Sequence, residues 1–165
     1  MGTNISYFLE PYGWSVCWFY KDGRSYEVNI SHSFGGDPMV VCMQSLMNLM
    51  KGDKSTSFVW YGEPGGNLII LNVIENLSKD VYIKVIDIEV DYGQELNFEE
   101  LAKGRAELEF QINKIQLVRM LYYEFKKMFE LMKGTEFSLT RKDEFPFKEF
   151  DEFEKIALEY INKIN

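Results

Sequence analysis

Hydrophobic and polar residues alternate in the first part of the chain in a pattern that predicts a β-hairpin. Large apolar residues flank Lys21-Asp22-Gly23 at every second position, and an Asp-Gly pair between two such runs is a strong turn signal. We therefore expect strands near residues 13–20 and 25–32.

The pattern changes to helical spacing after this hairpin. Apolar residues recur every three or four positions from Pro38 to about Lys51, and Gly52 is typical of a helix C-terminus. The preceding stretch "SFGGDP", residues 33–38, has the glycines of an anion-binding loop. Asp37, however, is a favourable N-cap that would place a negative charge where an anion would lie. We interpret the stretch as a turn and the start of a helix.

Shorter apolar runs in the middle of the chain are typical of strands. They predict four more strands, at residues 55–63, 67–77, 81–92 and 105–113. The turn "EPGG" separates the first two, and a turn at Ser78-Lys79-Asp80 separates the next two. Residues 93–104 form a loop with room for one helical turn.

From Lys114 the hydrophobic period lengthens from two to nearly four, which predicts a long amphipathic helix over residues 114–133. A last helix follows over residues 149–164. The predicted order is β-β-α-β-β-β-β-α-α. Short hairpin connections favour antiparallel pairing, so we expect an α+β fold of two layers, with a mainly antiparallel sheet of about six strands and helices on one face. Residues 1–165 then form a single domain.

The charge of the chain indicates which kinds of molecule it is expected to bind. The chain has 26 acidic and 18 basic residues, for a net charge of −8. Because an acidic surface repels phosphate backbones, this charge argues against nucleic acid and favours a cationic protein partner. The sequence contains neither a signal peptide nor an apolar run long enough to span a membrane, so we expect no membrane association and a cytoplasmic location.

Candidate catalytic residues are few. His32 is the only histidine and stands between Ser31 and Ser33, while Cys17 and Cys42 lie inside apolar runs typical of buried cysteine. No nucleophile elbow or zinc-ligand spacing accompanies them. We therefore expect no enzyme activity, no cofactor and no metal.

Acidic residues form the most informative pattern in the sequence. They alternate with apolar residues in "IDIEVDY" and recur on the polar face of "AELEF", the next predicted strand. If these two strands pair antiparallel, up to five carboxylates share one open sheet face, namely Asp87, Glu89, Asp91, Glu107 and Glu109. Like charges on neighbouring strands are destabilising, so such a face either has lysines nearby or meets a basic partner.

The alternation of apolar and polar residues changes along the strand predicted at residues 81–92. Val81, Ile83 and Val85 occupy the face that the acids take later, so a β-bulge near Val85–Ile86 is expected. Two other interpretations of the acids stay open at this point: an ordinary solvated sheet face, and a site for Ca²⁺ or Mg²⁺.

The segment "WYGEPGG", residues 60–66, joins aromatic residues, an acid and a glycine turn. Trp60, Tyr61 and Glu63 are candidate anchors for a partner, since tryptophan and tyrosine are common at the centres of interfaces. A simple turn with an exposed acid is the alternative.

The hairpin leading into "DP" and a helix, followed by "WYGEPGG" before a series of strands, resembles the immunity proteins encoded beside bacterial polymorphic or contact-dependent toxins. The resemblance implies a non-catalytic protein that neutralises a basic toxin by occluding it. The acidic residues would then steer association, and Trp60, Tyr61 and Glu63 would anchor the partner. A structural or regulatory homo-oligomer, such as a homodimer, and a small-molecule-binding domain are the alternatives.

Overall fold

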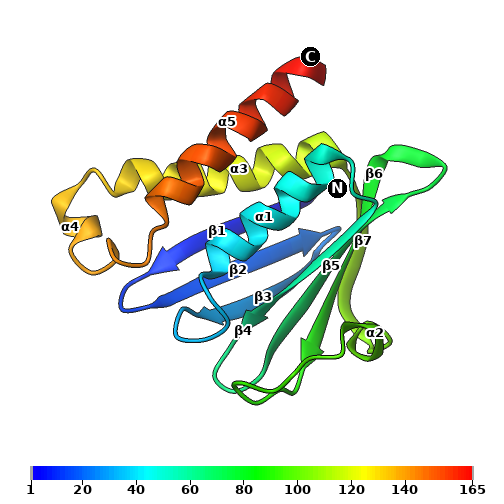
Figure 1. Ribbon diagram of the computed structural model, residues 1–165, viewed down its shortest axis with the longest axis horizontal. Helices are drawn as coiled ribbons and strands as arrows, with labels where there is room; N and C mark the ends of the chain where they lie inside the picture. Colours follow the sequence, from blue (N-terminus) through cyan, green and yellow to red (C-terminus); the bar gives the residue numbers. More distant parts are fainter. Residues whose placement is uncertain (1, 165) are drawn as a thin grey trace.

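The computed structural model describes residues 2–164, which form two antiparallel sheets with helices packed on them (Figure 1). The first sheet has the order β1-β2-β3, with strands β1 (Thr3–Glu10), β2 (Trp14–Lys21) and β3 (Arg24–Ser31). The predicted hairpin at Lys21-Asp22-Gly23 is confirmed, because β2 and β3 pair antiparallel with Lys21 opposite Arg24.

The second sheet has the order β4-β5-β6-β7 and follows the chain without crossovers. Its strands are β4 (Ser55–Tyr61), β5 (Gly66–Ile74), β6 (Leu77–Ile88) and β7 (Ala106–Asn113). In Figure 1 these strands fan out below the helices and run beside β3. The α+β class is therefore confirmed, but the strands of residues 2–164 number seven and belong to two sheets.

The three long helices lie on one side of the sheets, as expected: α1 (Pro38–Lys51), α3 (Lys114–Leu131) and α5 (Phe147–Ile164) (Figure 1). The short helices are α2 (Phe98–Leu101) and α4 (Thr135–Ser138). At the start of α1, Asp37 accepts hydrogen bonds from the backbone N–H groups of Met39 and Val40, so its predicted role as a cap is confirmed. Gly52 ends the helix with a φ of 114°, a conformation that glycine adopts without strain.

One large hydrophobic core joins both sheets to these helices. It contains residues such as Tyr7 from β1, Phe19 from β2, Trp60 from β4 and Phe125 from α3. The apolar stripe of α5 enters the same core through Phe150, Phe153, Ala157 and Ile161. The aromatic residues of the last helix are thus mainly structural.

A smaller cluster covers the opposite face of the second sheet. Leu68 and Ile70 of β5 pack there with Ile86 and Ile88 of β6, against partly buried Leu101 at the end of α2. This packing explains why β5 is buried on both faces over most of its length. In the part of the chain that the structure describes, no helix is long and apolar enough to cross a membrane.

Strands β1 and β6 differ most from the sequence prediction. Strand β1 was not predicted, although Ile5, Tyr7 and Leu9 alternate with more exposed residues and are at most 1% exposed. The turn predicted at Ser78-Lys79-Asp80 is wrong: β5 ends at Ile74 and β6 begins at Leu77, so a two-residue turn precedes the position expected.

Candidate functional site

The turn between β4 and β5 is held close to the end of β6. Gly62 donates its backbone N–H to the carbonyl oxygen of Gly65 at 2.9 Å, which closes the turn. Gly65 has a φ of 74°, and a Cβ atom there would lie 2.7 Å from the carbonyl oxygen of Ile88. Only glycine therefore allows the turn to approach β6 this closely. The approach brings "WYGEPGG" beside the acidic segment, two parts of the chain that are distant in sequence.

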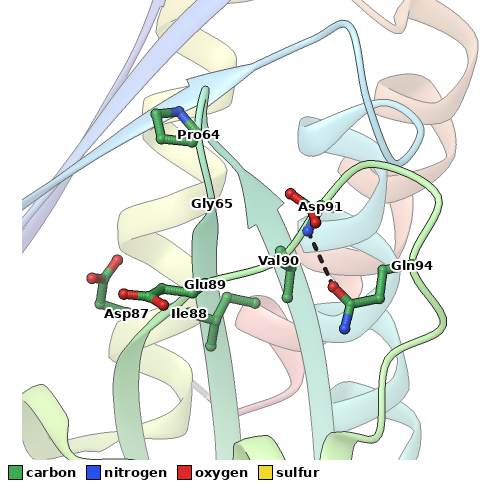
Figure 2. Close-up of a pocket in the computed structure, with 8 residues that line it drawn as sticks. All are labelled: Pro64, Gly65, Asp87, Ile88, Glu89, Val90, Asp91 and Gln94. Carbon is green, nitrogen blue, oxygen red and sulfur yellow. Dashed lines mark hydrogen bonds between the residues drawn. The ribbon is translucent and has the colours of Figure 1, made fainter.

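An acidic cleft of about 530 Å³ lies between this turn and residues 87–94. Asp87, Glu89 and Asp91 line it together with Pro64, Gly65, Ile88, Val90 and Gln94 (Figure 2). All three acidic side chains are exposed. Among the described residues that line the cleft, none is basic. The acidic cleft is therefore a concave surface at which a positive charge would be stabilised.

The segment that carries these acids leaves the sheet as it enters the cleft. Strand β6 ends at Ile88, so Asp87 is in the strand while Glu89 and Asp91 lie beyond it. Asp91 donates its backbone N–H to Oε1 of Gln94 at 3.2 Å (Figure 2). Gln94 donates its own backbone N–H to the Asp91 carbonyl oxygen. The expectation that three acids share one strand face is wrong, and a loop brings them around the cleft instead.

Neither glutamate of β7 lines the acidic cleft. Glu109 is directly opposite Lys84 of β6, on the face away from the core, whereas the alternation along β6 places Asp87 on the same face as Val85. The five acids therefore do not share one open face, and that expectation is wrong. A hydrogen bond with Glu109 raises the pKa of the nearby Tyr82 hydroxyl to about 12.

The bulge expected near Val85–Ile86 is present, and it explains the position of Glu107. Val85 pairs with Leu108 and Ile86 with Ala106, so Glu107 is an extra residue on β7. The bulge does not change the alternation of β6, whose register with β5 stays regular at this point. The face on which Asp87 lies is thus set by the regular alternation of β6.

Glu107 and Glu109 line a different cleft, of about 510 Å³, with residues of the β2–β3 turn. Lys21 and Arg24 lie in that cleft too, so its acids have basic neighbours. Burial raises the pKa of the Tyr26 hydroxyl, a hydrogen bond with Asn67 opposes this rise, and the charges of Asp87 and Glu107 add to it. The acidic cleft differs from this second cleft because no basic residue lies among the described residues that line it.

The three candidate anchors of "WYGEPGG" have different positions. Trp60 is 1% exposed, and its indole N–H donates to the carbonyl oxygen of Pro38 at 2.9 Å, so it belongs to the core and not to the surface. Tyr61 is half-buried beside the acidic cleft. Glu63 is exposed, and one of its carboxylate oxygens accepts a hydrogen bond from the Ser31 hydroxyl at 2.6 Å.

The candidate catalytic residues do not form an accessible group. His32 Nε2 lies 2.7 Å from the Ser15 hydroxyl oxygen, but Ser15 is 1% exposed. Cys17 and Cys42 are free and buried, and burial raises the pKa of both thiols. Over residues 2–164, no group of three or more histidine, cysteine, aspartate or glutamate side chains is placed to hold a metal ion.

No protein-family model matches the chain, and no curated protein matches it in sequence. A search of solved structures finds similarity to a chain of the CdiA-CT/CdiI toxin and immunity complex from Enterobacter cloacae. The match has a TM-score of 0.47 and 9% sequence identity, and it covers 74% of this chain and 98% of that chain.

Proposed function

We propose that the protein binds a basic partner protein at the acidic cleft and neutralises that partner by covering it, as a non-catalytic immunity protein. The observation that supports this function is the convergence of Asp87, Glu89 and Asp91 on one concave surface whose described lining has no basic residue. A partner with a matching positive surface would supply the missing counter-charges.

Electrostatics would act mainly on the rate of association. The chain carries a net charge of −8, and a concentrated negative patch within that field attracts a basic protein over distances of about one Debye length, roughly 8 Å at physiological salt. Complementary charge of this kind commonly raises association rates by about tenfold or more at low salt. Binding at the acidic cleft should therefore weaken as the salt concentration rises.

The first test is capture of the partner. The tagged protein is incubated with a low-salt lysate of its source, and a basic protein retained at low salt but released at high salt is the candidate. Its association rate is then measured by surface plasmon resonance against a double variant, Asp87→Lys with Glu89→Lys. We expect the rate to fall about tenfold or more at low salt.

A matched control variant has the same net charge as the Asp87→Lys, Glu89→Lys variant but leaves the acidic cleft intact. Glu152→Lys with Glu159→Lys changes two exposed residues of α5. This control should alter the association rate by about twofold or less, because its charges lie outside the cleft. Equal effects of the two double variants would contradict the proposed cleft. A salt-independent dimer with no bound protein would instead favour a homo-oligomer.

A further inference from the structure

A second pocket, of about 380 Å³, adjoins the acidic cleft and has aromatic walls. Phe34, Tyr61 and Tyr92 contribute the aromatic rings, and Glu63 and Asp91 contribute carboxylates. We call these five residues the aromatic pocket. It shares Asp91 with the acidic cleft, so a side chain that enters it would lie beside the acidic surface.

The aromatic walls come from three separate segments that are held together. The rings of Phe34 and Tyr92 have centroids 4.6 Å apart and are tilted by 45°. The backbone at Gly35 lies against the third ring, because a Cβ atom there would be 2.2 Å from the Tyr61 ring. The loop before α1 therefore has a role beyond capping: it places Phe34 beside Tyr61.

The carboxylate of Glu63 is fixed by a short hydrogen-bond chain. Ser31 is 1% exposed and donates its hydroxyl to Glu63 Oε1 at 2.6 Å. The backbone N–H of Ser33 donates in turn to the Ser31 hydroxyl oxygen at 3.1 Å. This chain links the β4–β5 turn to the loop that carries Phe34, so the acid and the aromatic wall hold a defined relative position.

We propose that the aromatic pocket receives an arginine side chain of the basic partner, an inference that rests on the proposed function. A guanidinium group is planar and weakly hydrated, so it stacks on aromatic faces while its N–H groups donate to carboxylates. The aromatic pocket offers both kinds of contact, from Phe34 and Tyr92 on one hand and from Glu63 and Asp91 on the other. Tyr92 is 71% exposed, which leaves much of its surface available to a partner. A lysine ammonium is more strongly hydrated and would gain less from these walls.

The test uses N-acetyl-arginine amide as a probe and the neutral citrulline analogue as its matched control. NMR titration of the full protein should show concentration-dependent shifts in the ring signals of Phe34 and Tyr92 with the arginine probe only. Tyr92→Ala should weaken the binding of the probe about tenfold, because it removes one face of the stack. Tyr123→Ala is the control variant, since Tyr123 is 60% exposed on α3 and also contacts another ring.

Glu63→Gln tests the charge separately, because glutamine keeps an oxygen that can accept from Ser31 but is neutral. This variant should also weaken probe binding. Equal shifts with citrulline, equal shifts with N-acetyl-lysine amide, or no shifts in the aromatic pocket would each overturn the assignment of arginine. If partner binding still depended on Asp87 and Glu89 in that case, the proposed function would stand without this pocket.

Discussion

Acidification should destabilise the protein through its single histidine, His32. Burial lowers the pKa of this imidazole from 6.5 to about 4, so the folded protein favours the neutral ring. At a pH above 6.5 the ring is neutral in both the folded and the unfolded protein, and the protein has its full stability. As the pH falls from 6.5 towards 4, the unfolded chain binds a proton at His32 while the folded protein does not, so the free energy of unfolding decreases. From this difference in pKa, the free energy of unfolding should fall by about 2 kcal/mol near pH 5 and about 3 kcal/mol near pH 4.

The assay compares the wild-type protein with His32→Gln in urea denaturation followed by tryptophan fluorescence. Glutamine cannot titrate, whereas the carboxylates titrate in both proteins. The difference between the two free energies of unfolding therefore isolates the histidine, whatever the substitution costs at neutral pH. Between pH 6.5 and pH 4, the free energy of unfolding of the wild type should fall relative to that of the variant. Parallel pH profiles, or an NMR titration of His32 with a midpoint near its unfolded value, would refute the reasoning.

Two further substitutions test the packing behind the site. Gly35→Ala should be more destabilising than Gly36→Ala by about 1–3 kcal/mol in urea denaturation, because both glycines have positive φ but only a Cβ atom at Gly35 meets the Tyr61 ring; equal losses would mean that the ring moves away freely. Trp60→Phe should cost about 2–4 kcal/mol of stability, since it removes a buried hydrogen bond and leaves a cavity. Its folded form should bind the captured partner with unchanged affinity, and a selective loss of binding would restore Trp60 as a contact residue.

Local signals in the sequence were sufficient for several elements. Asp37 and Gly52 define the ends of α1 because caps act on backbone groups only a few residues away. The Asp-Gly turn likewise fixes the β2–β3 hairpin through its own backbone geometry. Strand β1 had a usable signal too, in the alternation of Ile5, Tyr7 and Leu9, which could have predicted it.

The candidate site was only partly predictable. The sequence identified Asp87, Glu89 and Asp91 as unusual, and it indicated a bulge beside them. It did not reveal that Trp60 is buried, because a tryptophan in a strand can face either the core or the solvent. Phe34 had no recognisable signal, since a single aromatic residue in a glycine loop gains its role only from the ring packed against it.

The sequence by itself determined the α+β class, the position of most helices and strands, and the excess of negative charge. These properties follow from residues close together in the chain, whose periodicity and caps act locally. Only the tertiary structure decided which acids meet. The close approach of Gly65 to Ile88 brings the turn after β4 to the end of β6, while strand register places Glu109 opposite Lys84. Contacts between distant segments depend on register and on how the sheets pack, so the acidic cleft and the aromatic pocket exist only in the folded chain.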